Sequence, residues 1–308
     1  MSINTPKISI IVPVFNAKMY LVEALDSLCN QTLKEIEIIC VNDGSNDGSW
    51  DILQKYAQKD YRIKLDKFEK PSGSAGVPRN RGMDLATGEY FAFLDADDYV
   101  DSTMFEKLYN KAIETKSDIV KCNSISFGEN KKTHRGKKYL DKIIPKTPFS
   151  IEECPDYLMS FCFWTGIYHK KLLKNKFPKV FATEDACWYI ENLLKSKKIC
   201  HISETLHFYR LLENSSSNDP KKKEIRINSE EFLCEYIIDL MKLQKDDKVK
   251  AILGAIVINH SAGNQTLTTK AFDISPNLKN ILKKDSRVVY KKVKRSIKKN
   301  KRKTRRVK

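Results

Sequence analysis

The 308-residue sequence has no run of 18 or more apolar residues, so it predicts no membrane-spanning helix. Its first residues, 1–7, lack the long apolar segment of a secretory signal peptide. The eight cysteines are scattered without a CxxC pair. This pattern predicts small buried thiols in a reducing compartment, and neither a disulfide framework nor a zinc site. Together these absences predict a cytoplasmic protein.

Two glycine-rich phosphate-binding motifs are also missing. No GxGxxG follows the first predicted strand, which argues against an NAD- or FAD-binding fold. No GxxxxGK[ST] occurs, which argues against a P-loop ATPase. A nucleotidyltransferase would also combine a metal with an α/β sheet, but the glycine-rich loop after its first strand is absent here.

The positive charge is concentrated at one end of the chain. The formal net charge is +17, and residues 291–308 hold twelve lysines and arginines and no acid. Removing these twelve charges from +17 leaves +5 over the first 290 residues. The charge therefore describes a basic tail, and the rest of the chain is only mildly basic.

Strands and helices alternate over the first hundred residues, which predicts an α/β fold with a mostly parallel sheet and helices on both faces. The apolar patterns predict strands at 8–13, 36–41, 62–68 and 90–94, and helices at 20–31, 50–59 and 81–87. Ligands in such folds bind outside the carboxyl ends of the strands. Three loops that follow strands, 13–16, 42–49 and 95–98, are therefore expected to converge on one edge of the sheet.

The remaining segments are less regular. We expect helices at 102–117, 151–175 and 184–196, strands at 118–127 and 199–209, loops at 128–150 and 215–220, and one or two amphipathic helices within 226–260. The predicted organisation is an α/β domain at 1–225 with halves 1–115 and 116–225, a helical extension at 226–290, and the basic tail at 291–308.

Three carboxylates lie within four residues directly after the apolar strand 90–94: Asp95, Asp97 and Asp98. Such a cluster repels itself unless a cation is bound. Carboxylate oxygens suit a hard divalent cation such as Mg2+ or Mn2+, and these ions commonly hold a phosphate-bearing substrate. The alternative is a strand followed by an acidic turn and a helix cap.

Other residues could contact a nucleotide. Phe15 could stack on a base, and Asp43 could accept hydrogen bonds from a base or a ribose, although Asp43 also fits an ordinary Asp-Gly turn. Arg79, Asn80 and Arg81 follow a flexible loop and could meet phosphate oxygens, since arginine makes bidentate, charge-assisted contacts to phosphate. The alternative is a solvated helix N-terminus.

The pair Glu184 and Asp185 lies among bulky apolar residues, where the pKa of a carboxyl group rises toward that of a general base. Alternatively, Thr183 or Asp185 caps the helix that follows. Trp164 is either a core residue or a platform on which a sugar stacks.

Taken together, the sequence resembles family 2 glycosyltransferases, which have the GT-A fold, of the inverting, bacterial surface-glycan type. The matching segments are ISIIVPVFNA, IEIICVNDGSNDGS and SAGVPRNRGMDLATGEYFAFLDADD, and more loosely FWTGIYHKKLL, TED at 183–185 and HFYRLLENSSS. They extend over residues 7–217, about two-thirds of the chain.

The resemblance implies roles at the matching positions. Asp97 would be the direct metal ligand, and Asp95 would touch the ribose or a metal-bound water. Asp185 would be the catalytic base, Glu184 an acceptor-binding residue or alternative base, and Trp164 an acceptor-binding residue. The implied donor-binding residues are Pro13, Phe15, Asn16, Asp43, Arg79, Asp95 and Arg210.

The implied reaction moves a hexose or N-acetylhexosamine from a nucleotide diphosphate sugar, with UDP expected, to a hydroxyl of a glycan or lipid-linked acceptor in surface polysaccharide or lipopolysaccharide synthesis. The metal offsets the charge of the leaving diphosphate, and a single displacement inverts the anomeric configuration. Val77-Pro78 and Gly166 depart from the family pattern, so the sugar specificity of relatives is not carried over.

The alternative function is a non-catalytic nucleotide- or nucleic-acid-binding protein that uses its basic tail. The presence of both Asp97 and Asp185 favours the enzyme, because a binding protein needs no base.

The tail itself suggests a location for the protein. From Leu278 onward, apolar residues recur on roughly one helical face among lysines, which predicts a basic amphipathic helix on the anionic inner face of the cell membrane. The alternative is a disordered, solvated tail. No nucleic-acid recognition module accompanies it, so no specific nucleic-acid partner is expected, and the sequence gives no signal for an oligomeric state.

Overall fold

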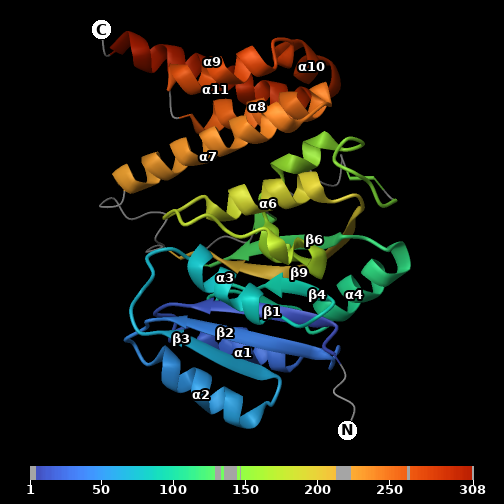
Figure 1. Ribbon diagram of the computed structural model, residues 1–308, viewed down its shortest axis with the longest axis vertical. Helices are drawn as coiled ribbons and strands as arrows, with labels where there is room; N and C mark the ends of the chain where they lie inside the picture. Colours follow the sequence, from blue (N-terminus) through green and yellow to red (C-terminus); the bar gives the residue numbers. More distant parts are fainter. Residues whose placement is uncertain are drawn as a thin grey trace. The chain divides into compact units, whose positions relative to one another are not determined.

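Figure 1 shows the computed structural model, which describes residues 5–128, 133–134, 144–145, 147–212, 223–261 and 264–306. The chain divides into two compact units. Unit 1 consists of Met1–Phe149, Cys162–Lys179 and Ser196–Ser215, and unit 2 consists of Ser150–Phe161, Val180–Lys195 and Ser216–Lys308. The predicted boundaries at residues 225 and 290 remain predictions.

The first half of the unit 1 sheet is parallel. Its strands are β1 (Ile8–Val14), β2 (Ile36–Asp43), β3 (Ile63–Phe68) and β4 (Tyr90–Phe93), in the order β3-β2-β1-β4. Every residue of β2 is buried, as expected for a parallel strand that is covered on both faces. The carboxyl ends of these strands lie at one edge of the sheet, where the three predicted loops begin.

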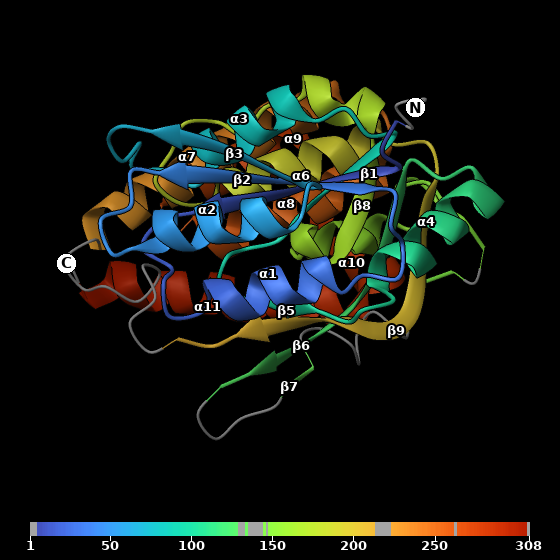
Figure 2. The same cartoon turned by 90° about the horizontal axis from the view of Figure 1, so that it is seen from below.

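Helices cover both faces of this half (Figure 2). Helices α1 (Leu21–Cys29) and α2 (Ser49–Lys59) lie on one face, and α3 (Gly76–Leu85) lies on the other. Helix α3 begins earlier than the predicted helix at 81–87, because its first turn tolerates Pro78 and Gly82 allows close packing on the sheet. A Cβ atom at Gly82 would lie 2.4 Å from Cγ2 of Ile11.

The second half of the sheet is mixed. It adds β8 (Gly166–His169), β6 (Ile119–Phe127), β9 (Ile199–Arg210) and β5 (Tyr99–Val100) in that order, with β7 (Thr133–His134) paired to β6 and α4 (Met104–Thr115) packed alongside. Strands β6 and β9 are parallel, while β8 is antiparallel to both β4 and β6. The predicted α/β class, a curled and mostly parallel central sheet with surrounding helices, is confirmed.

The helix predicted at 151–175 is wrong. This segment contains three short 3-10 turns, η1 (Pro155–Met159), η2 (Phe163–Thr165) and η3 (Lys170–Lys174), with strand β8 between the last two. The β-branched and aromatic side chains of Ile167 and Tyr168 fit a strand that pairs on both sides, and both residues are fully buried. The loop predicted at 215–220 and most of that at 128–150 lie outside the described residues.

Unit 2 is helical. It comprises α6 (Glu184–Lys195), α7 (Lys223–Leu243), α8 (Asp247–His260), α9 (Gln265–Ile274), α10 (Leu278–Asp285) and α11 (Arg287–Arg306). Helix α8 is its centre: nine of its residues are buried, and it packs against α7, α9, α10 and α11. None of the helices in the described part of the chain is long and apolar enough to cross a bilayer.

The basic C-terminal segment is helical from Arg287 to Arg306, so the disordered-tail alternative is wrong for this stretch. Its apolar side packs into unit 2, with Val289 and Val293 each only 1% exposed. The hydroxyl of Ser296 donates a hydrogen bond of 2.8 Å to Oδ1 of Asn259 on α8. The helix therefore buries Val289 and Val293 in unit 2, while the described lysines 291, 292, 294 and 298 are exposed.

Candidate active site

Hydrogen bonds hold the turn after β1 against the loop after β2. The N–H of Asn16 donates to Oγ of Ser45, and the N–H of Asn46 donates to Oδ1 of Asn16, each at 3.0 Å. Asn16 has φ of 47°, a left-handed conformation that asparagine tolerates. This turn leaves Phe15 52% exposed, so its ring is available for stacking.

Asp43 ends β2 and is buried. The N–H of Ser72 donates to Oδ1 of Asp43, and the hydroxyl of Ser72 donates to Oδ2, both at 2.9 Å. The chain passes so closely here that a Cβ at Gly44 would lie 2.6 Å from the nitrogen of Pro71. Ser72 thus orients the Asp43 carboxylate, and each oxygen keeps a lone pair for a ligand.

Arg79 is the residue of the 79–81 segment that faces the acidic cluster. Its guanidinium is buried, donates to Oδ1 of Asp95 at 2.8 Å, and lies 4.9 Å from the ring centre of Phe163 and 5.6 Å from that of Phe177. Stacking on aromatic rings and a carboxylate partner fix the planar cation in place. Asn80 instead bonds the backbone of Phe177, and Arg81 pairs with Asp66.

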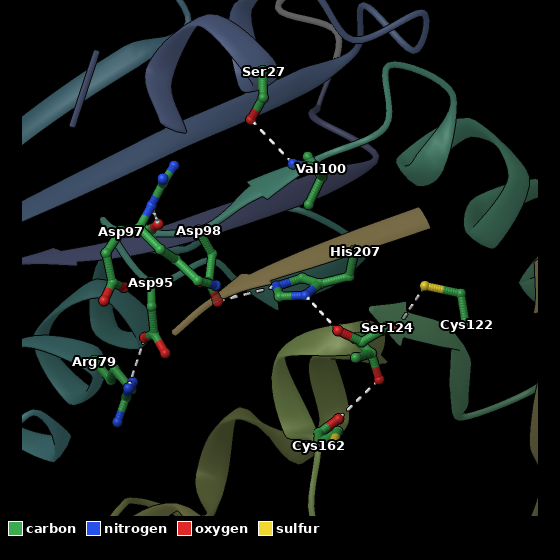
Figure 3. A network of polar contacts seen from close by, with 12 residues as sticks. Ser27, Arg79, Asp95, Asp97, Asp98, Val100, Cys122, Ser124, Cys162 and His207 are labelled. Atoms are coloured by element: carbon green, nitrogen blue, oxygen red, sulfur yellow. Dashed lines mark hydrogen bonds and ion pairs between the residues drawn. The ribbon is translucent and has the colours of Figure 1, made fainter. Parts of the chain in front are cut away.

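The three clustered carboxylates have different surroundings (Figure 3). Asp95 pairs with Arg79, whereas in the described residues the carboxylate of Asp97 has no hydrogen bond or ion pair to another residue. Burial, and then the charge of Asp95, raise the pKa of Asp97 to about 6. A nearby cation would relieve this unfavourable charge.

These residues fit a hard divalent cation. Mg2+ commonly takes one or two carboxylates and completes its coordination with water and substrate phosphates. Asp97, with Asp95 beside it, supplies oxygen ligands of this kind. Within the described parts of the chain, no group of three or more His, Cys, Asp or Glu side chains is arranged to hold a metal.

Asp98 is held from a distant strand. Its Oδ1 accepts a hydrogen bond of 2.7 Å from the N–H of Arg210, and its Oδ2 lies 3.5 Å from Nε2 of His207. Burial, followed by the charges of Asp95 and Asp97, raises the pKa of Asp98 well above its usual range. The alternative of an acidic turn with a helix cap does not describe Asp98, because the partners of its carboxylate in the described structure come from β9.

Arg210, the last residue of β9, lies beside the same turn. Its Nε donates to the backbone oxygen of Asp97 at 2.8 Å, and its Nη2 pairs with Glu23 of α1. The guanidinium also lies 4.7 Å from the ring centre of Tyr20 and 4.5 Å from that of Phe127. The structure thus brings both arginines that were predicted to bind the diphosphate to the acidic turn. Arg79 pairs with Asp95, and Arg210 pairs with Glu23.

Trp164 is a core residue of unit 1. It is 7% exposed, stacks on Tyr209 at 5.5 Å and meets the edge of Phe163 at 5.2 Å. Its predicted acceptor-binding role stays a prediction. Nearby Gly166 has no room for a side chain, since its Cβ would lie 2.7 Å from Cγ of Lys121, which explains one departure from the family pattern.

Glu184 and Asp185 begin α6 and belong to unit 2. Glu184 is buried, and Oδ1 of Asp185 accepts the N–H of Ala186 at 2.8 Å. Thr183 before them has φ of 69°, which is strained for a β-branched residue, and its hydroxyl donates to the backbone oxygen of Ser229 at 2.8 Å. Such strain often occurs at functional loops.

Three contacts at this site were not predicted: Ser72 on Asp43, Glu23 on Arg210, and His207 on Asp98. Each partner is far away in sequence, and no local pattern marks it. Only His207 lies in a segment that the resemblance had matched, three residues before Arg210.

The family model described as Glycosyl transferase family 2 matches residues 9–191. The chain therefore belongs to glycosyl transferase family 2. The crystal structure of Staphylococcus aureus TarS 1–349 in complex with UDP-GlcNAc is similar to it, with a TM-score of 0.74 and 20% identity over 98% of this chain and 92% of that one. The mannosyltransferase PcManGT from Pyrobaculum calidifontis, in complex with GDP-Man and Mn2+, has a TM-score of 0.61 and 16% identity over 88% and 74%.

Curated relatives agree with this family. The chain is 31% identical over 226 residues to the uncharacterized glycosyltransferase EpsJ of Bacillus subtilis, covering 70% of this chain and 64% of that protein. It is 36% identical over 225 residues to the poly(ribitol-phosphate) beta-glucosyltransferase of Bacillus spizizenii, covering 69% and 33%. The chain thus spans less than two-thirds of the length of these two relatives.

Proposed function

We propose that the protein is a metal-dependent, inverting glycosyltransferase that moves a hexose or N-acetylhexosamine from a UDP-sugar to a hydroxyl of a surface glycan or its lipid-linked precursor. The observation that carries the proposal is the partly buried Asp97 carboxylate, which has no hydrogen bond or ion pair to another residue in the described part of the chain. It lies in the turn that Arg79 and Arg210 contact. The similarity to a UDP-GlcNAc complex and to a GDP-Man and Mn2+ complex supports a nucleotide-sugar donor and a divalent metal.

The donor is proposed to lie along the carboxyl edge of β1, β2 and β4. The exposed ring of Phe15 would stack on the base, while the carboxylate of Asp43, oriented by Ser72, would accept hydrogen bonds from the base or ribose. The guanidinium groups of Arg79 and Arg210 would meet the diphosphate. Pro13 and Asn16 shape the turn that presents Phe15.

The proposed reaction needs stabilisation of a leaving diphosphate and removal of one proton. When bound by Asp97 and Asp95, a divalent cation offsets the charge that develops on the leaving group. Arg79 and Arg210 add fixed positive charge on the same group. Asp185 takes the proton of the acceptor hydroxyl, with Glu184 binding the acceptor, and displacement from the opposite face inverts the anomeric carbon.

The surface-glycan setting rests on the relatives, one of which is named as a poly(ribitol-phosphate) beta-glucosyltransferase. Helix α11 is proposed to bring the enzyme to an anionic membrane surface. Because Val289 and Val293 are buried in unit 2, this contact would be electrostatic and would not insert an apolar face. Each basic residue close to an anionic surface contributes about 1 kcal/mol.

The donor assignment can be tested by thermal-shift measurements with UDP-, GDP- and dTDP-sugars, each with and without Mn2+. We expect UDP-sugars to stabilise the protein most, and Mn2+ to increase the shift, because a divalent cation held by Asp97 and Asp95 would offset the charge of the diphosphate. Stabilisation by GDP- or dTDP-sugars alone would contradict the UDP assignment. Shifts that are equal with and without Mn2+ would contradict the metal.

A further inference from the structure

Three polar side chains form a buried row behind the acidic turn (Figure 3). Asp98 is 1% exposed, His207 0% and Ser124 4%. Nδ1 of His207 lies 3.1 Å from Oγ of Ser124, and Nε2 lies 3.5 Å from Oδ2 of Asp98. The row therefore runs from β6 through β9 to the turn.

The backbone fixes this alignment. Ser124 and His207 are register partners in the parallel ladder of β6 and β9. On the same strand as His207, the N–H of Arg210 holds Oδ1 of Asp98 at 2.7 Å. Buried polar groups cost free energy unless they are paired, so the hydrogen bond from Arg210 to Oδ1 and the approach of Nε2 of His207 to Oδ2 favour one arrangement of the turn.

The acidic turn is held at both ends. Asp95 is fixed by Arg79 at 2.8 Å, and the N–H of Asp98 donates to the backbone oxygen of Asp95 at 3.0 Å. At the other end, Asp98 is fixed by β9. Asp97 lies between them, and Nε of Arg210 also binds its backbone oxygen at 2.8 Å. The carboxylate of Asp97 is thus the group of the turn that these contacts leave available.

We propose that Asp98 and His207 are positioning residues that hold the turn so that the Asp97 carboxylate points at the bound metal and the donor diphosphate. Ser124 supports them by fixing the ring of His207. The inference rests on the proposed metal-dependent function. Groups that orient a metal ligand change metal affinity by about 10–100-fold when they are removed.

The same strand offers a matched control. His201 also lies on β9, and its Nε2 lies 3.1 Å from Oδ1 of Asn123 on β6. His201 thus repeats the contact of His207 with β6, but it is the register partner of Lys121 and lies six residues before His207 on β9, whereas His207 is the partner of Ser124. Its replacement removes a similar strand-to-strand contact without touching Asp98.

The experiment measures Mn2+ binding to the full chain by electron paramagnetic resonance, without donor, for wild type, His207→Phe, Ser124→Ala and His201→Phe. Thermal unfolding of each variant is measured in parallel. We expect His207→Phe to weaken Mn2+ binding by about tenfold or more and Ser124→Ala to weaken it less. His201→Phe is expected to lower the melting temperature while keeping Mn2+ binding within about twofold of wild type.

Two results would overturn the inference. One is a folded His207→Phe variant that binds Mn2+ as wild type does, or, should that variant fail to melt cooperatively, wild-type binding by Ser124→Ala. The other is an equal loss in His201→Phe, since the effect would then be general destabilisation. If wild type itself binds no Mn2+, the proposed metal site fails, and the positioning role fails with it.

Discussion

Neighbouring carboxylates in this protein differ because of the groups that surround each one. Asp95, Asp97 and Asp98 have the same chemistry but different partners. Asp95 is paired with an arginine, Asp98 is bound to a distant strand, and the carboxylate of Asp97 has no hydrogen bond or ion pair to another of the described residues. The sequence predicted the cluster and its carboxyl-edge position, because both follow from the strand before it. It did not predict His207 or Ser72, since strand pairing and loop packing bring them from distant segments.

Glu37 shows the same principle in a structural role. It is 2% exposed on β2, and its carboxylate accepts hydrogen bonds from Ser9 at 2.5 Å, from the N–H and hydroxyl of Thr87 at 2.7 and 2.9 Å, and from Lys64 at 2.5 Å. Burial alone would raise the pKa of Glu37, but these bonds outweigh it and hold the pKa below its usual value. The carboxylate therefore ties β1, β3 and the turn before β4 to β2.

We predict that Glu37→Gln lowers the free energy of unfolding at pH 7 by about 2 kcal/mol, since hydrogen bonds to a charged group are lost. Because the folded pKa is depressed, this stabilisation is present above the unfolded pKa near 4.5 and disappears as the pH falls through the folded value. Denaturant unfolding at pH 7 and at a pH below the folded pKa measures both effects.

The control is Glu35→Gln, two residues away, where an exposed ion pair with Lys7 should contribute about 0.5 kcal/mol or less. Equal losses in the two variants at pH 7, or a difference between wild type and Glu37→Gln that persists at low pH, would contradict this role of Glu37.

At the scale of elements, the sequence predicted strands correctly where burial alone determines the spacing of apolar residues. Strands β1, β2 and β4 were predicted because continuous apolar runs report a strand that is covered on both faces. The segment 151–175 was misassigned because short 3-10 turns around β8 imitate helical spacing. The pairing of β8 on both sides is decided by distant strands, which a local period does not report.

Helix α11 permits a direct test of the membrane proposal. Its apolar residues are buried, so deleting the helix would expose the core, whereas neutralising its exposed lysines and arginine keeps the fold. We predict that glutamine at these positions abolishes flotation with anionic liposomes and leaves the melting temperature unchanged. The positions are Lys291, Lys294, Arg295 and Lys298.

The matched control replaces four lysines on and beside α7 and α8, Lys242, Lys245, Lys248 and Lys250, with glutamine. This variant should float as wild type does. If the α11 variant and the control variant both float as wild type does, the basic helix is not the membrane contact.

At the scale of the whole molecule, the predicted functions are divided between the two units. The residues proposed to bind the donor and the metal belong to unit 1, while Glu184 and Asp185 belong to unit 2, at the strained start of α6. The resemblance to family 2 predicted a role for both groups, whereas their spacing in the sequence does not indicate that they act in one reaction. The proposed reaction requires Asp97 to hold the metal and Asp185 to take the acceptor proton.

Release of UDP from a UDP-sugar, measured with Mn2+ and a glycan acceptor, tests this account most directly. The proteins compared are wild type, Asp97→Ala, Asp185→Asn and the control Asp84→Asn, which changes a carboxylate on α3 that is 55% exposed. We predict losses of about a hundredfold or more in the first two variants, with unchanged melting, and full turnover in the control. Near-wild-type turnover in folded Asp97→Ala or Asp185→Asn would contradict the account.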